Sequence, residues 1–391
     1  MKKNWTLLMI TTAGTLIATG CATNKTKATA AVPAPAVDYT APVTVTGTDT
    51  FETAQAAVDH IVTGWNLGNT LDSTGNASSD LAAETSWGNP LTTKEMITAV
   101  KNAGFNAVRL PVTWQDHMNS KGNVRSAWMK RVHEVVDYCI SQDMYCIVNV
   151  HHDRWVCADQ NMYNKNVEKF HTLWTEIATE FRDYDEHLLF ESTNETLDAQ
   201  MNWGGTTPEN FEIINKWNQV FVNTVRSTGG NNYCRNLIPM TYAGSSEINV
   251  MEAFTLPTDV VSNHLIVEVH NYDPQGFCWT DASWTKMTNV WDEAEYGAGL
   301  IKTFDRMKSY ADKWDVPIII GEWGSQKKIL SGSTYNDEER GKHAKFFVGE
   351  AKKRGIKCFW WDCGDFALIN RKKTQPIHQP VIDGIMTGAS E

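Results

Sequence analysis

The sequence lacks the marks of several large protein classes. None of its eight cysteines forms a CxxC pair, which argues against a structural zinc site. Beyond the N-terminus, no apolar run is long enough to span a membrane. Positive charge is in deficit, with a formal net charge of −11, so nucleic acid and anionic surfaces are not expected partners.

The N-terminus has the pattern of an export signal. It reads Met1-Lys2-Lys3, then an apolar run over 5–18, then Thr19-Gly20-Cys21. The run is too short for a comfortable span, so residues 1–20 are expected to be a signal peptide. The small residues before Cys21 indicate bacterial lipoprotein cleavage with lipidation of Cys21, although Ala18 stands where a larger aliphatic residue is usual. Plain signal-peptidase cleavage nearby is the alternative.

Residues 21–49 are rich in Ala, Thr, Pro and Val and have no periodic core pattern. This composition predicts a flexible linker between the anchor and a folded domain over 50–391. The protein is therefore expected to be exported, either as a lipoprotein of the cell envelope or outer membrane or as a secreted protein. Membrane contact would occur only through the lipid anchor, and a monomer is expected.

Seven cysteines remain if Cys21 is lipidated, and an odd number argues against a complete disulfide framework. Three of them lie in apolar helical or strand patterns and are predicted to be buried thiols: Cys139, Cys146 and Cys358. One bridge stays open among the other four, Cys157, Cys234, Cys278 and Cys363.

Short, almost unbroken apolar runs alternate with segments of helical period from residue 60 onward. Continuous apolar runs indicate strands buried on both faces, as in a parallel sheet. Gly104 and Gly355 each stand just before such a run, where glycine commonly caps the preceding helix. The predicted strands are 61–67, 105–110, 145–150, 188–190, 237–241, 265–269, 316–320 and 356–361.

Eight strands alternating with helices predict the α/β class and a single-domain (β/α)8 TIM barrel. The alternative is an open doubly wound sheet. That fold carries a Gly-rich phosphate loop after its first strand. The sequence at this place is Gly-Trp-Asn-Leu-Gly-Asn-Thr, which lacks such a loop, so the open sheet is disfavoured.

Polar side chains follow all eight predicted strands, at the end where the active site of such a barrel lies. Any one of them could be a capping or surface residue, but a set at every strand end indicates a functional site. The set is Asn66, Arg109, His151 with His152, Asn194 with Glu195, Tyr242, His270 with Tyr272, Glu322, and Trp361 with Asp362.

Two carboxylates in this set, Glu195 and Glu322, directly follow buried strand sequence, where an ionised group is costly without partners or a function. The geometry of a barrel brings strands four and seven across the mouth from one another. Cleavage of a glycosidic bond needs two such carboxyl groups, one to protonate the leaving oxygen and one to attack or to activate water.

The neighbours offer the two carboxyls different environments. Arg109 and Tyr272 could hold Glu322 ionised, and His270 would lie near Glu195, whose pKa should be the higher if it supplies the proton. Asn194 would bond a sugar 2-hydroxyl, and Trp361 would form the floor under the ring. Each also has a structural explanation: Arg109 as a salt bridge at the mouth, His151 as a buried imidazole, Trp361 as packing.

Seven motifs, taken in order, resemble glycoside hydrolase family 5, in particular its cellulase and xyloglucanase branch. The resemblance covers residues 60 to about 387. The motifs are GWNLGNTLD at 64–72, NAVRLPVTW at 106–114, VNVHHD at 148–153, ESTNE at 191–195, VHNYDP at 269–274, IIIGEWG at 318–324 and FWWDCG at 359–364.

The resemblance implies that Glu195 is the acid/base and Glu322 the nucleophile of a retaining hydrolase. It places Arg109, His151, Asn194, His270, Tyr272 and Trp361 at the family's remaining active-site positions. Asn66 and His152 match residues near the glycone-side subsites. Thr196 departs from the usual Asn-Glu-Pro, which affects the following loop, and the neighbouring Trp360 leaves open which indole stacks on the sugar, with Trp361 favoured.

The expected activity is that of an endo-β-1,4-glucanase, or cellulase, acting on cellulose, mixed-linkage glucan or xyloglucan. Sixteen tryptophans suit sugar stacking as well as core packing. An insertion after the sixth strand, over 275–296, is expected to wall the leaving-group side of an open groove, with Trp87 and Trp155 as candidates for the other side. A β-mannanase or xylanase of the same fold is the nearest alternative.

Two further alternatives belong to other classes. A metal-dependent barrel hydrolase would use His151, His152, His270 and Asp362, but the first strand offers Trp65 and Asn66 where such barrels carry a His-X-His pair. A non-catalytic glycan-binding lipoprotein would ordinarily have lost a carboxylate. No cofactor and no metal are expected, because two carboxyl groups suffice for the reaction.

Overall fold

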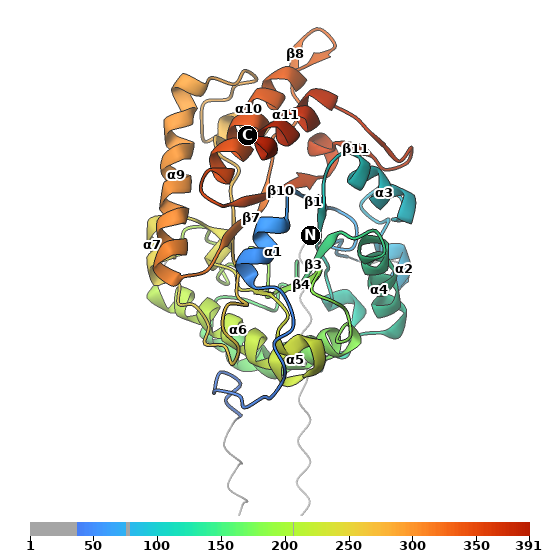
Figure 1. The fold of residues 1–391 in the computed structure, drawn as a ribbon, viewed down its shortest axis with the longest axis vertical. Coiled ribbons are helices and arrows are strands. Elements are labelled where there is room, and N and C mark those ends of the chain that lie inside the picture. Colours follow the sequence, from blue (N-terminus) through green and yellow to red (C-terminus); the bar gives the residue numbers. More distant parts are fainter. Residues whose placement is uncertain (1–36, 76–78, 206) are drawn as a thin grey trace, which may run out of the picture. The chain divides into compact units, whose positions relative to one another are not determined.

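Eight short segments form one parallel sheet in the middle of the computed structural model (Figure 1). The strands follow the order β5-β4-β3-β2-β1-β10-β7-β6, and parallel bridges from Leu237 to Leu265 and from Met240 to Glu268 connect its two ends into a barrel. The strands are β1 (Gly64–Leu67), β2 (Ala107–Leu110), β3 (Tyr145–Asn149), β4 (Leu188–Glu191), β5 (Leu237–Ile238), β6 (Val267–His270), β7 (Ile318–Trp323) and β10 (Lys357–Asp362).

Every apolar run that predicted a strand overlaps one, so the (β/α)8 barrel is confirmed. The observed strands differ mainly at their ends. Strand β5 is only two residues long, whereas β7 continues past the apolar run and includes Glu322. The carboxylate therefore sits on the strand itself and not on the following loop.

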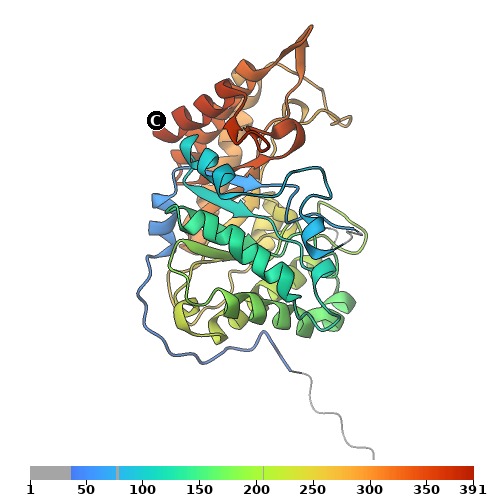
Figure 2. The ribbon, with the colours of Figure 1, turned by 90° about the vertical axis from the view of Figure 1, so that its right-hand side faces the viewer.

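A helix follows each barrel strand and packs against the outside of the barrel (Figures 1 and 2). The helices α3, α5 and α9 begin at side-chain N-caps, Thr93, Asp159 and Asp292. Gly104 and Gly355, with φ of 106° and 72°, follow α3 and α10 as predicted. The eight helices are α3 (Lys94–Asn102), α4 (Ser126–Ile140), α5 (Gln160–Glu180), α6 (Pro208–Ser227), α7 (Ile248–Ala253), α9 (Glu293–Trp314), α10 (Asp337–Lys352) and α11 (Gln379–Ser390).

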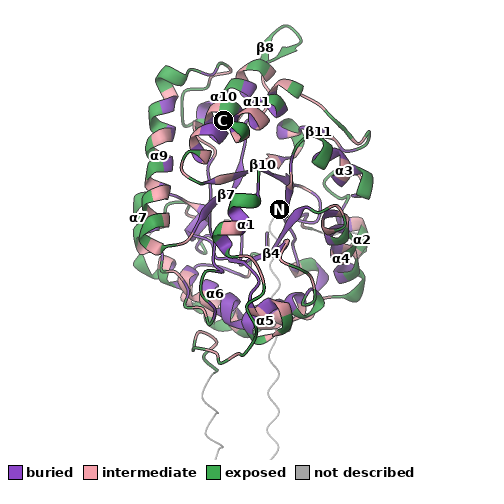
Figure 3. Cartoon of the chain, in the orientation of Figure 1, coloured by how far each residue is buried: buried purple, intermediate pink, exposed green. Residues whose placement is uncertain are grey.

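Two apolar cores result from the alternation of side chains along the strands. The larger lies between the strands and the helices, whose outward faces are exposed (Figure 3). The smaller fills the barrel interior with residues such as Ile147, Ile238 and Phe359, and includes Ala57 and Val58 of α1 (Ala54–His60). Helix α1 thus covers the N-terminal end of the barrel, so the opposite end is left for the site.

The structure describes residues 37–75, 79–205 and 207–391. The expected signal peptide, Cys21 and the first part of the expected linker lie outside these ranges. The compact unit begins at Tyr39, earlier than the predicted boundary at residue 50. Asn223 Nδ2 donates to the carbonyls of Tyr39 and Ala41, and His264 Nε2 lies 3.0 Å from Asp49 Oδ1. Residues 39–49 therefore run along the barrel surface (Figure 2).

Several shorter helices, hairpins and turns lie within the loops. They are the helices α2 (Asp80–Ala83) and α8 (Gln275–Cys278), the hairpins β8 (Ile329–Ser331) with β9 (Thr334–Tyr335) and β11 (Ile369–Asn370) with β12 (Gln375–Pro376), and the 3-10 turns Gln115–His117, Gly230–Tyr233, Tyr242–Gly244 and Gly364–Phe366. Within the described residues, no helix combines the length and apolar character needed to cross a bilayer.

All seven cysteines of the described ranges are free thiols. Cys139, Cys146 and Cys358 are buried, as predicted. The bridge left open among the other four does not form, and Cys363 instead accepts a hydrogen bond from Trp361 Nε1.

Candidate active site

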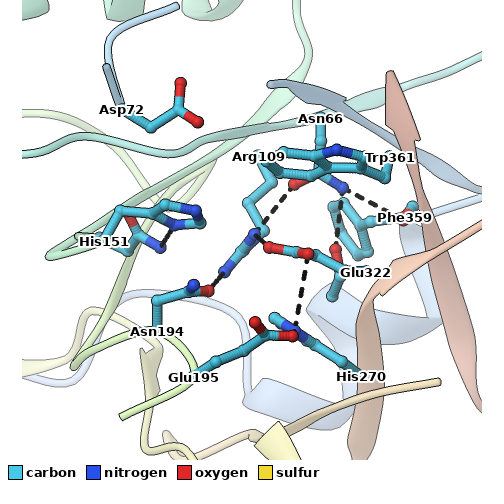
Figure 4. Close-up of polar contacts among 12 residues, drawn as sticks. Asn66, Asp72, Arg109, His151, Asn194, Glu195, His270, Glu322, Phe359 and Trp361 are labelled. Atoms are coloured by element: carbon cyan, nitrogen blue, oxygen red, sulfur yellow. Dashed lines mark hydrogen bonds and ion pairs between the residues drawn. The ribbon is translucent and has the colours of Figure 1, made fainter. Parts of the chain in front are cut away.

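Two carboxyl groups face each other at the C-terminal end of the barrel. Glu322 lies on β7 and Glu195 on the loop after β4, and they point toward a shared centre (Figure 4). A carboxylate oxygen of Glu195 lies within 4.8 Å of one of Glu322. The Glu195 side chain is 25% exposed and that of Glu322 only 7%. One acid is therefore open to a ligand, and the other is held beneath it.

Both oxygens of Glu322 receive hydrogen bonds. Arg109 Nη1 donates to Oε1 at 2.7 Å and Tyr272 Oη donates to Oε2 at 3.0 Å. Burial nevertheless raises the pKa of Glu322, against the positive charges of His270 and Arg109, which lower it. The predicted stabilisation of the ionised form of Glu322 by Arg109 and Tyr272 is therefore opposed by the burial of the carboxyl group. Burial and the adjacent Glu322 raise the pKa of Tyr272 well above 10, so its hydroxyl stays a neutral donor.

Arg109 is fully buried and is the centre of the polar network. Its guanidinium binds Glu191 through Nε and Nη2 at 2.6 and 2.7 Å, in addition to Glu322. Nη2 also donates to Asn194 Oδ1 at 2.8 Å. Burial alone would lower the pKa of Arg109, but the carboxylates Glu191, Glu268 and Glu322 raise it well above its usual value. The guanidinium is therefore permanently charged and fixes several side chains at once.

Asn66 does not line the groove as expected. Its side chain is completely buried, and Nδ2 donates to the carbonyls of Gly321, Phe359 and Trp360 while Oδ1 accepts from Arg109. All its polar atoms are used inside the protein, so none is left for a ligand. Asn66 instead orients the Arg109 guanidinium, through the hydrogen bond that its Oδ1 accepts from Nη1.

Glu191, the last residue of β4, and Glu268, inside β6, belong to this network and were missed by the analysis of strand ends. Glu268 Oε1 is 3.2 Å from both Arg109 Nε and His270 Nε2. Burial raises the pKa of Glu191 to about 7, against the lowering effect of Arg109. An acidic residue within an apolar strand is itself a signal, because a buried charge needs a partner. Gly321 is required beside them: a Cβ there would lie 1.6 Å from Glu268 Oε1.

His270 connects the two catalytic candidates. Nδ1 lies 2.8 Å from Glu195 Oε1 and 3.7 Å from Glu322 Oε2, while Nε2 faces Glu268. Although burial alone would lower it, the pKa of His270 is raised to about 10 by these three carboxylates. The imidazole therefore carries a positive charge at neutral pH and donates through both nitrogens.

This charge predicts a pH dependence of stability. The folded pKa of about 10 exceeds the reference value of 6.5, so the contribution of His270 is complete below pH 6.5 and is lost as the pH rises through 10. We expect His270→Gln to reduce the slope of unfolding free energy against pH by up to about 1.4 kcal/mol per pH unit in this window. Urea denaturation at several pH values measures the slope, and an unchanged slope in a folded variant would contradict the assignment.

His151, His152 and Trp361 form the opposite side of the site. The His151 and Trp361 rings are parallel within 5°, with centroids 5.9 Å apart. Burial lowers the pKa of His152 to about 4 and that of His151 well below 6.5, so both are neutral. A Cβ at Gly68 would lie 2.8 Å from the Trp361 ring, so glycine is needed there. Trp360 is fully buried, which leaves Trp361 as the indole available to a ligand.

Two members of the strand-end set do not join the site. Tyr242 is buried, accepts from the backbone N–H of Asp198 and donates to the Asn202 carbonyl, which fixes the loop after β4. Asp362 accepts from the backbone N–H groups of Leu368 and Ile369. Both residues support loops at the mouth without facing the two acids.

Aromatic residues of the loops divide between core and surface. In the insertion after β6, Phe277 and Trp291 are buried, Trp279 packs 4.8 Å from Tyr272 between ring centroids, and Trp284 is 69% exposed. On the other side Trp87 is 40% exposed. Trp155 is half-buried, with Nε1 bound to Asp153, and exposed Trp203 in the loop after β4 was not anticipated. Exposed indoles therefore occur in the loops after β1, β4 and β6.

Two groups in the described residues bring three ligand-type atoms within 4.8 Å: Asp72, His151 and His152, and Glu195, His270 and Glu322. In the second, the charged His270 has no lone pair for a metal ion. In the first, Asp72 already accepts from the backbone N–H groups of Asn69 and Thr70. We assign neither as a metal site.

A (β/α)8 barrel with two facing carboxyls, an arginine clamp and an indole floor defines the class of barrel glycoside hydrolases. The family model described as cellulase (glycosyl hydrolase family 5) matches residues 71–367. The chain belongs to this family.

Known relatives agree with that membership. Endoglucanase A of Clostridium longisporum is 37% identical over 350 residues, a match that covers 86% of this chain and 66% of the relative. A solved broad-specificity endoglucanase from the same organism has a TM-score of 0.82 and 35% identity, over 87% of this chain and 99% of that one. A family 5 enzyme of Prevotella bryantii, solved with a xyloglucan tetradecasaccharide, has a TM-score of 0.79 and 38% identity, covering 88% and 100%.

Proposed function

We propose that the protein is a retaining endo-β-1,4-glucanase in which Glu322 is the nucleophile and Glu195 the acid/base. The separation of the two carboxyls carries this proposal. Retaining glycosidases hold the two groups about 5 to 5.5 Å apart and inverting ones about 6.5 to 9.5 Å apart, to make room for water. Oxygens within 4.8 Å of each other fit the retaining class.

The environments assign the roles. Glu322 receives hydrogen bonds on both oxygens and lies on a rigid strand, which suits an attacking carboxylate. Glu195 is more exposed and can reach the leaving oxygen. In the first step Glu322 bonds to the anomeric carbon while Glu195 transfers its proton to the departing glycan. In the second, Glu195 takes a proton from water, which attacks the same carbon and releases Glu322.

Other side chains orient the sugar. Asn194 uses Oδ1 to accept from Arg109, so its NH2 group is the donor for the 2-hydroxyl. Trp361 offers its indole face as the floor, with His151 and His152 beside it. Exposed indoles in the loops after β1, β4 and β6, Trp87, Trp203 and Trp284, suit a long chain cut internally. The named relatives, two endoglucanases and an enzyme solved with a xyloglucan oligosaccharide, support a glucan substrate over mannan or xylan.

A substrate panel tests the proposal. We expect the purified protein to reduce the viscosity of carboxymethyl-cellulose, mixed-linkage glucan or xyloglucan faster than reducing ends accumulate. Proton NMR should show the β-anomer as the first product released. Release of the α-anomer would contradict retention, and activity confined to mannan or xylan would replace the substrate.

We further propose that the enzyme is exported as a monomer anchored by a lipid on Cys21, with residues 22–38 as the tether. The basic start, the short apolar run and the small residues before Cys21 support this proposal. In a bacterial host the wild type should partition with membranes, and Cys21→Ala should lose the lipid label and leave the membrane fraction. A wild type without lipid, cleaved near residue 20, would favour plain secretion.

A further inference from the structure

Asn149, at the end of β3, makes three contacts that fix the orientation of its amide. The backbone N–H of Val112 donates to Oδ1 at 3.0 Å. Nδ2 donates to Glu191 Oε1 at 2.9 Å and lies 3.0 Å from His151 Nδ1. A backbone N–H can only donate, and both Glu191 oxygens accept from Arg109. The amide therefore cannot be flipped without placing oxygen against oxygen.

This orientation determines the tautomer of His151. Because Nδ2 of Asn149 presents hydrogen to Nδ1, that ring nitrogen must accept, and the proton of the neutral imidazole lies on Nε2. The ring is 8% exposed and lies parallel to Trp361, and a ring flip that kept this plane would remove Nδ1 from its donor, Asn149 Nδ2 at 3.0 Å.

We infer that Asn149 is a positioning residue that fixes His151 as its Nε2–H tautomer, so that the ring offers a donor to a sugar hydroxyl beside Trp361. A chain of hydrogen bonds then connects the Arg109 guanidinium, which holds Glu322, to the sugar-binding imidazole of His151. It runs through Glu191 and Asn149. The sugar contact rests on the proposed function, whereas the tautomer is a property of the free protein.

The tautomer can be observed directly. Full-length protein carrying ¹⁵N-labelled histidine, studied by two-bond ¹H–¹⁵N correlation, should show His151 with Nδ1 unprotonated and Nε2 protonated. His151→Gln identifies its signals among those of the eleven histidines. The pattern should persist through the pH range in which free histidine titrates.

Two variants change the partner of Nδ1. Asn149→Asp places an oxygen where the amide N–H was, so His151 should take up a proton on Nδ1. Asn149→Ala removes the donor, so both tautomers should appear, and kcat/KM on a soluble glucan should fall about tenfold. Asn218→Ala is the matched control: Asn218 is also a buried amide, binding Ser192 and the backbone of Met240, and should leave the His151 signals unchanged.

The inference is overturned if wild-type His151 carries its proton on Nδ1, or if a folded Asn149 variant keeps the wild-type pattern. Should neither variant fold, the wild-type spectrum alone decides. A wild type with the expected tautomer but no glucan cleavage would refute the proposed function and leave the tautomer assignment standing.

Discussion

Replacing Glu322 with Gln is expected to lower kcat on every glucan by at least about 10⁴-fold, because no other group can bond to the anomeric carbon in its place. Glutamine has nearly the same shape: its amide oxygen can still accept from Arg109, and its NH2 group can donate to the Tyr272 hydroxyl oxygen, which can act as an acceptor. The fold should therefore survive, and thermal denaturation would confirm it. Glu84→Gln is the matched control, since Glu84 is also a buried acid, paired with Arg131 outside the mouth.

Alanine variants with azide separate the two roles. In Glu322→Ala, azide can enter the space left by the carboxylate and attack from the face opposite the leaving group, which should give an α-glycosyl azide. In Glu195→Ala, an aryl glycoside that needs no acid should still form the intermediate with Glu322. Azide then replaces water in the second step and should give a β-glycosyl azide. Exchanged anomers would reverse the assignment, and full activity of either variant would remove that residue from the mechanism.

The sequence was sufficient for the fold because burial on both faces leaves a local pattern. Each strand reads as an apolar run, and each helix shows its three-to-four spacing. The ends were less predictable: in β5, pairing is limited to Leu237 and Ile238, and β7 extends through Glu322. Hydrogen bonding between strands sets these ends, and no single segment contains that information.

The site could be predicted only in part, for a similar reason. The analysis of strand ends identified Glu195, Glu322 and their neighbours as candidate site residues. It did not show that Asn66 turns inward, because its orientation depends on Arg109 and on three carbonyls of other strands. It also omitted Glu268, whose place inside an apolar strand has meaning only once Arg109 and His270 are known to lie beside it.

Arg109 gives the second large effect, because it is the shared partner of several buried acids. Arg109→Met would leave Glu191 without its cation, leave Glu268 with only His270 as a cation, and remove one donor from Glu322. Breaking a buried ion pair from one side typically costs about 3–5 kcal/mol. We expect a loss of unfolding free energy of about this size at pH 8, measured by urea denaturation.

The loss should depend on pH in a definite direction. Removing the cation raises the pKa of Glu191 beyond its already raised value of about 7. A carboxyl whose folded pKa lies above its unfolded one is most favourable to folding at low pH, and this advantage disappears as the pH rises through the folded pKa. Arg109→Met should therefore be less destabilised at pH 5 than at pH 8.

The loss of the Arg109 charge should also change the pH dependence of activity. Without Arg109 the pKa of Glu322 rises further, so the acidic limb of the kcat/KM profile should move to higher pH, with a rate loss of about 10²-fold or more. Arg226→Met is the control: Arg226 is equally buried and binds Asp259 through two hydrogen bonds far along α6, so its loss should cost stability while leaving the limb in place. A folded Arg109→Met with the wild-type limb would show that charge at this position does not set the ionisation of Glu322.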